Sequence, residues 1–175
     1  MTDATEGAPE APQAGLSPVL SSVLASGAFV VPLALSFSTR LSPRRPRTLL
    51  WYRTLRQPPW KPADALIPLA WTGIESALAL AAYRLLRQPS APARNKSLGW
   101  LALNVVNIGS WSWLFFGKRN LPASTLAAAA MAGAGAAYVD QARKADLPAA
   151  VAGVPFVAWV AFATALTAAI WRRNA

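Results

Sequence analysis

The feature that most constrains this chain is a series of five long apolar runs with little polar sequence between them. They lie at residues 16–39, 65–86, 98–116, 121–139 and 148–171. A bilayer core about 30 Å thick needs about 20 helical residues, and each run comes close to or exceeds that length. Strands of a membrane barrel alternate over about 10 residues, so continuous runs exclude a barrel. The runs predict an all-α fold, an integral membrane bundle of five transmembrane helices.

The segment before the first run has a different composition. Residues 1–15 are rich in Ala, Pro, Gly and acidic residues, which is typical of disorder. We therefore expect a disordered tail followed by one membrane domain over residues 16–175. The first run has no basic stretch ahead of it and is longer than the about 7–15 residues of a signal-peptide core, so it predicts a membrane helix.

Charge is the next constraint. The chain has 17 Lys and Arg against 7 Asp and Glu, a formal net charge of +10. In a soluble protein this excess would indicate nucleic-acid binding. Here the charges lie in short segments between apolar runs, which favours contact with membrane lipid and no nucleic-acid partner. One side of the bundle would carry 11 of the basic residues and the other 6. This bias predicts an outside N-terminus and a cytoplasmic C-terminus. The helical spans themselves favour a bacterial inner membrane.

The chain contains no cysteine and no histidine. This excludes disulfides, thiol nucleophiles, Ser-His-Asp triads, and zinc, iron–sulfur or haem sites that use those side chains. We expect no catalytic residues, no metal site and no cofactor.

Polar side chains within the third run share one helical face. At about 100° per residue, Trp100, Asn104, Asn107 and Trp111 form a stripe, whereas Trp113 turns toward lipid. Amides that face hydrocarbon are costly, so the stripe faces protein or a cavity. Hydrogen bonds between helices and a ligand cavity are both compatible with it.

Glu75 lies one turn beyond Trp71 in the second run, with no basic residue inside that run to pair with it. A charge at the centre of a membrane helix costs about 2.5–3.5 kcal/mol. Three interpretations remain open: a neutral carboxyl bonded to Asn104 or Asn107, a group near the membrane interface, or a group that faces a wet cavity.

The segment between the first two runs is more than a simple linker. Residues 51–62 contain two tryptophans, a tyrosine and three prolines, and each proline fixes its φ angle. Such a stiff aromatic segment can form a lid over the mouth of the bundle or rest at the membrane interface.

Four motifs resemble the translocator protein family, also called tryptophan-rich sensory proteins or peripheral-type benzodiazepine receptors. They are Trp51-Tyr52 with Leu55, Pro58, Trp60 and Pro62 in the first loop, Pro68-Leu69-Ala70-Trp71-Thr72, Phe115-Phe116-Gly117-Lys118-Arg119, and Pro155 to Leu166 followed by Trp171 and Asn174. Departures from the family pattern include Asn107, which lies one place early, and Glu75 where a tyrosine is common.

The resemblance implies a five-helix bundle, usually a homodimer, whose cavity opens toward the first loop. Family members bind porphyrins and other flat hydrophobic molecules. Motif matches and the polar stripe give these candidate ligand-binding residues: Trp51, Tyr52, Trp60, Trp71, Glu75, Asn107, Trp111, Trp159, Phe162, Ala163 and Leu166.

The functional expectation is an integral membrane tetrapyrrole-binding translocator or sensor, with a tryptophan-lined cavity closed by the first loop. Arg53, Arg56 or Lys61 would meet the propionates of a porphyrin. Two alternatives stay open: light-dependent porphyrin degradation, with Trp71 and Trp159 as electron donors, and proton-coupled transport of small amphipathic molecules through Glu75.

Overall fold

The structure, a computed structural model, describes residues 14–36 and 46–175 and is helical throughout its regular elements, with no strand in those ranges. Most of the expected disordered tail lies outside the described residues. The elements are α1 (Pro18–Ser36), α2 (Pro46–Thr54), α3 (Leu66–Arg87), α4 (Pro92–Ser112), the π-helical turn η1 (Trp113–Gly117), α5 (Leu121–Ala142) and α6 (Leu147–Asn174). The expected all-α fold is confirmed.

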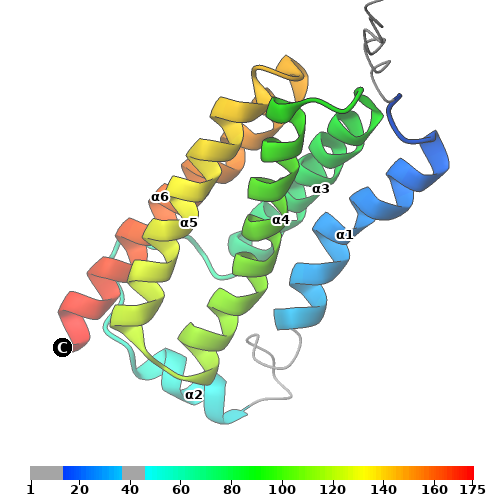
Figure 1. The fold of residues 1–175 in the computed structure, drawn as a ribbon. Coiled ribbons are helices and arrows are strands. Elements are labelled where there is room, and N and C mark those ends of the chain that lie inside the picture. The colour runs from blue at the N-terminus through cyan, green and yellow to red at the C-terminus, as the bar shows by residue number, and fades with distance from the viewer. Residues whose placement is uncertain (1–13, 37–45) are drawn as a thin grey trace, which may run out of the picture.

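The five long helices form a ring in which α1 contacts α3 and α4, α3 contacts α6, and α5 contacts both α6 and α4 (Figure 1). The short helix α2 lies across the end of the bundle where the chain terminates (Figure 1). We call this the α2 end. The opposite end holds the α3–α4 and α5–α6 connections and is called the far end.

Local sequence explains where the last two helices begin. The Asn120 side chain accepts a hydrogen bond from the Ala123 amide at 3.0 Å and caps α5. Asp146 caps α6 in the same way, from the Ala149 amide at 2.7 Å. Each cap is followed within the first turn by a proline, which has no amide hydrogen left unpaired there. Helices α5 and α6 therefore begin within one residue of the first residues of the fourth and fifth predicted runs.

The other boundaries differ in ways that the sequence explains. α4 begins at Pro92, six residues before the predicted start at 98, because Pro92 is itself a good first helical residue. Its first turns contain Arg94, Asn95 and Lys96 and so extend beyond the apolar run. The segment between the first two runs was expected to be a proline-stiffened loop, but its described part begins with α2, and Trp51 and Tyr52 lie on that helix.

The predicted count of five membrane helices is not exact. Within residues 14–36 and 46–175, three helices are long and apolar enough to cross a bilayer by composition, at Pro18–Leu35, Leu66–Arg87 and Leu147–Asn174, with mean hydropathies of 1.9, 1.3 and 2.0. α4 and α5 are 21 and 22 residues long, which is sufficient length. Their composition is weaker, because α4 holds three asparagines and α5 is built largely from Ala and Gly.

Packing in the bundle depends on small residues that let helices approach closely. A Cβ atom at Gly153 of α6 would overlap the Tyr138 ring of α5, and the Tyr138 hydroxyl donates to the Ala149 carbonyl at 2.8 Å. Close contacts of this kind stabilise membrane bundles, where lipid tails are as apolar as the helices. The outer surface carries exposed apolar side chains such as Leu126 (69% exposed) and Leu69 (68%), as a lipid-facing surface requires.

Candidate functional site

Aromatic side chains from three segments form a continuous line across α3, α6 and the first loop. The rings of Trp71 and Trp159 lie edge to face, with centroids 6.4 Å apart. Trp159 continues to Phe162 at 5.6 Å, and Phe162 meets Trp60 at 5.8 Å. Edge-to-face aromatic pairs contribute about 0.5–1.5 kcal/mol beyond the area they bury. Four of the predicted ligand-binding residues therefore lie together.

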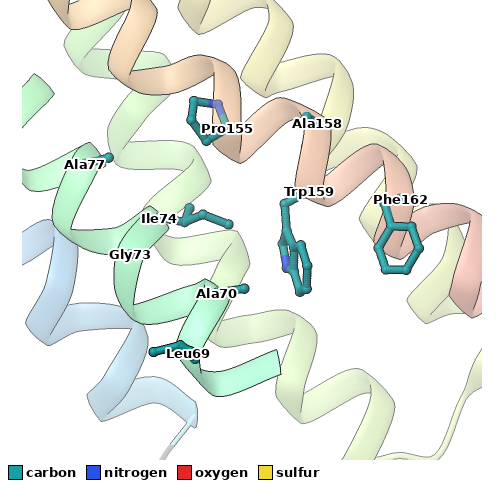
Figure 2. A pocket seen from close by; sticks show the side chains of 9 residues that line it. All are labelled: Leu69, Ala70, Gly73, Ile74, Ala77, Pro155, Ala158, Trp159 and Phe162. Carbon is teal, nitrogen blue, oxygen red and sulfur yellow. The ribbon is translucent and has the colours of Figure 1, made fainter. Parts of the chain in front are cut away.

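A groove of about 520 Å³ lies beside this line, between α3 and α6. Its walls are Leu69, Ala70, Gly73, Ile74 and Ala77 from α3, and Pro155, Ala158, Trp159 and Phe162 from α6 (Figure 2). Ala70 and Ile74 point from α3 toward the Trp159 ring (Figure 2). Gly73, Pro155 and Ala158 are exposed, so the groove opens to the outside of the bundle, unlike the enclosed cavity that we expected.

The Trp159 indole N–H is the unusual polar group of the groove. Its Nε1 atom is buried and has no hydrogen-bond partner among the described residues. By contrast, the Trp111 indole donates to the Ser124 carbonyl at 2.9 Å. An unpaired buried donor costs about 1–3 kcal/mol, so the burial of the Trp159 N–H is left uncompensated by the residues that the structure describes.

Asn104 is a buried polar residue that the list of candidate sites did not include. It is 1% exposed, its Nδ2 donates to the Trp100 carbonyl at 2.9 Å, and its Oδ1 is unpaired within the described part of the chain. Its place on the polar stripe is the sequence feature that could have identified it as a candidate. The predicted Asn107 is only half-buried.

Glu75 is half-buried on α3 and has neither a hydrogen bond nor an ion pair with any residue that the structure describes. The interpretation in which it bonds to Asn104 or Asn107 is therefore not seen. Its carboxyl remains available for a proton or a polar ligand group.

Other predicted residues form a second cluster at the α2 end. Trp111 stacks on Phe115 at 4.9 Å, Trp51 meets the edge of Phe115 at 5.7 Å, and Tyr52 meets Phe116 at 6.0 Å. Leu166 also packs here. The π-turn η1 supplies both phenylalanines. This cluster joins α2 to the bundle and does not line the groove, and no contact places Ala163 in the groove.

Tyr52 links this cluster to the loop that follows α2. Burial raises the pKa of the Tyr52 hydroxyl, while the nearby Lys61 ammonium opposes that shift. The hydroxyl donates to Asp64 at 3.3 Å and accepts from Lys61 at 3.4 Å, and Lys61 is paired with Asp64. The pKa of Lys61 is raised: burial alone would lower it, but the bonds to Asp64 and Tyr52 outweigh that effect.

The loop after α2 is attached to the end of α6. The Arg56 amide donates to Asn174 Oδ1 at 3.0 Å, and Asn174 Nδ2 donates back to the Arg56 carbonyl at 3.2 Å. Together with the contact of Trp60 and Phe162, this attachment holds the loop beside the α2 end of the aromatic line.

Comparison with known proteins agrees with this architecture. The TspO/MBR family model matches residues 28–172. The chain belongs to the TspO/MBR family. The match runs from the second half of α1 into the last turn of α6, so the resemblance carried by the four motifs is confirmed.

Relatives of this TspO/MBR family member include animal and bacterial proteins. The translocator protein of Ovis aries is 30% identical over 132 residues, which cover 71% of this chain and 75% of that relative. The tryptophan-rich sensory protein of Cereibacter sphaeroides is 28% identical over 124 residues, with coverages of 71% and 77%. Protein CrtK of Rhodobacter capsulatus is 28% identical over 130 residues, with coverages of 71% and 78%. The chain is a membrane protein of the translocator and sensor type.

Proposed function

We propose that this protein binds a tetrapyrrole, a metal-free porphyrin, in the groove between α3 and α6 and acts as a membrane sensor or translocator of that ligand. The unpaired N–H of Trp159 is the observation that carries the proposal. A groove lined by an indole and a phenyl ring suits a flat apolar molecule, and the N–H supplies one directed polar contact. The loop after α2 would close over the ligand.

The positive charge of the residues that follow the aromatic segment of α2 supports an anionic ligand. Arg53 and Arg56 follow the aromatic segment of α2, and neither has an acidic partner in the described ranges. Propionates of a porphyrin are carboxylates, which guanidinium groups bind well. Lys61 contributes less, because Asp64 already pairs with it.

Porphyrin titration into purified protein in lipid nanodiscs tests the proposal, with the porphyrin absorbance as readout so that loss of a tryptophan does not change the signal. Trp159→Phe keeps an aromatic ring and removes the N–H. We expect its dissociation constant to rise by at least about tenfold, because a hydrogen bond to a charged group contributes about 1.5–3 kcal/mol and each 1.4 kcal/mol is about tenfold in affinity. Trp113→Phe is the matched control, because Trp113 is 48% exposed and lies outside the groove. Unchanged affinity in the Trp71→Phe, Trp159→Phe double variant would refute the proposal.

Glu75 supports a second candidate, proton-coupled transport. A half-buried carboxyl without a partner inside a membrane helix is typical of proton relays. Glu75→Gln removes the titratable proton and keeps the shape. We expect uptake of a small amphipathic cargo into proteoliposomes under an imposed pH gradient to fall in this variant and porphyrin affinity to stay within about twofold. Uptake that is indifferent to Glu75→Gln would reject proton coupling through this residue.

We further propose that the α2 end faces the cytoplasm of a bacterial inner membrane and that the protein is a homodimer. The excess of Lys and Arg at the α2 end supports the orientation. Protease accessibility in inverted vesicles and mass measurement of the solubilised protein test these two points.

A further inference from the structure

The two ends of the bundle differ in how their basic side chains are neutralised. At the far end, Arg84 pairs with Asp146 at 2.9 Å, and Arg143 and Lys144 both pair with Asp140 at 2.7 Å. Arg87 and Arg94 donate to backbone carbonyls. Most of the positive charge at the far end is therefore satisfied by the protein itself.

The α2 end has little such compensation. Lys61 pairs with Asp64. The other basic side chains there have no acidic partner in the ranges 14–36 and 46–175: Arg47, Arg53, Arg56, Lys118, Arg119, Arg172 and Arg173. A group of uncompensated cations at one end of a membrane bundle attracts anions. Each Lys or Arg near an anionic membrane surface contributes about 1 kcal/mol to that attraction.

Two of these cations line a recess of about 460 Å³ between η1, the start of α5 and the end of α6. Lys118, Arg119 and Asn120 form one wall, and Trp171 and Asn174 come from α6. Arg119 has a φ of 55°, a left-handed conformation that costs a residue with a Cβ about 1–2 kcal/mol. The fold therefore holds a non-glycine residue in an unfavourable backbone conformation at this wall.

Aromatic rings hold both side chains without neutralising them. The Lys118 Nζ lies 4.9 Å from the Trp113 ring centroid, and the Arg119 guanidinium lies 5.4 Å from that of Trp51. Cation–π contacts fix the position of a charge and leave its hydrogen-bond donors free. Trp113 and Trp171 are 48% and 37% exposed, as expected of indoles at the boundary between headgroups and acyl chains.

We infer that this recess binds the headgroup of an anionic phospholipid, whose phosphate meets Lys118 and Arg119 and whose acyl chains run beside Trp171. The recess shares no residue with the groove between α3 and α6, so the inference does not depend on porphyrin binding. A phospholipid rather than free phosphate is the ligand, because exposed indoles border the cations and α6 provides an apolar surface for the chains.

Thermal unfolding in a neutral detergent, with added phosphatidylglycerol or phosphatidylcholine, tests this inference. The Lys118→Gln, Arg119→Gln variant removes both charges. The matched control is Arg143→Gln, Lys144→Gln, which removes two cations at the far end. Arg119→Gly is a further variant that relieves the positive φ and is expected to keep the fold.

We expect phosphatidylglycerol to raise the midpoint of unfolding by several degrees more than phosphatidylcholine does, both in the unmodified protein and in the far-end control. The difference should be lost in Lys118→Gln, Arg119→Gln and at least halved in Arg119→Gly. Equal effects of the two lipids, equal losses in the control, or the same stabilisation from inorganic phosphate alone would each overturn the inference.

Discussion

Asn174, at the last turn of α6, forms two hydrogen bonds with the backbone of Arg56, 118 residues away in the sequence. Its Nδ2 also donates to the Ile170 carbonyl at 2.8 Å, which fixes the side-chain orientation. One amide therefore satisfies both backbone groups of Arg56. This pairing explains in physical terms why the aromatic loop and the end of α6 lie together.

Replacement of Asn174 by alanine should release the loop after α2. We expect trypsin to cleave after Arg56 several times faster in Asn174→Ala, since cleavage requires the backbone to leave its paired position. Asn95→Ala is the control, because Asn95 bonds to Ser90 and Arg94 at the far end. Equal cleavage rates in the two variants would mean that the ring contact of Trp60 and Phe162 holds the loop by itself.

Asp146 connects three segments at the far end and should make stability depend on pH. Burial alone would raise its pKa, but hydrogen bonds from Arg84, the Ala149 amide and Gln88 outweigh burial and lower it from the ordinary value of 3.8. A group with a lowered pKa stabilises the fold above its unfolded pKa, and that stabilisation is lost as the pH falls through the folded pKa.

The unmodified protein should therefore lose stability from about pH 4 downward, and Asp146→Asn should show a smaller loss over that range. At neutral pH, Asp146→Ala should lower the free energy of unfolding by about 1–3 kcal/mol, because it removes a helix cap and a paired carboxylate. Asp140→Ala provides the comparison, since Asp140 is 43% exposed and an exposed pair contributes about 0–1 kcal/mol. Unfolding curves between pH 3 and 7 measure both effects.

The long helices could be predicted from the sequence because hydropathy and proline placement are local signals. The starts of α5 and α6 follow directly from Asn120 and Asp146. Helix α2 was missed because its nine residues combine charge with aromatic groups, and its stability comes from contacts with η1 rather than from its own pattern.

The candidate site could be predicted only in part. Trp71, Trp159, Phe162 and Trp60 lie together as the motifs indicated. Helical periodicity gave the face of Trp111 but not its partner, since the Ser124 carbonyl that accepts its N–H belongs to another helix. The unpaired state of the Trp159 N–H depends on what surrounds it in three dimensions, which no local pattern encodes.

Gly153 should be essential for contact between α5 and α6. A Cβ atom there would overlap the Tyr138 ring, so Gly153→Ala should lower the free energy of unfolding by about 1–3 kcal/mol through overpacking. Gly133→Ala is the control, since nothing lies within 4 Å of the added atom. That control should be neutral or stabilising by up to about 1 kcal/mol. Indistinguishable unfolding midpoints in the two variants would contradict close packing at Gly153.

Trp111 and Trp159 should respond in opposite ways to the same substitution. Trp111→Phe breaks the hydrogen bond to Ser124 while an aromatic ring remains against Phe115, so it should cost about 1 kcal/mol of stability. Its porphyrin affinity should be unchanged. Trp159→Phe removes a donor that has no protein partner in the described ranges. It should leave stability unchanged or slightly higher and weaken binding. Paired unfolding and titration measurements on the two variants separate a structural indole from a ligand-binding one, and the assignment of roles is wrong if Trp111→Phe proves to be the variant that loses affinity.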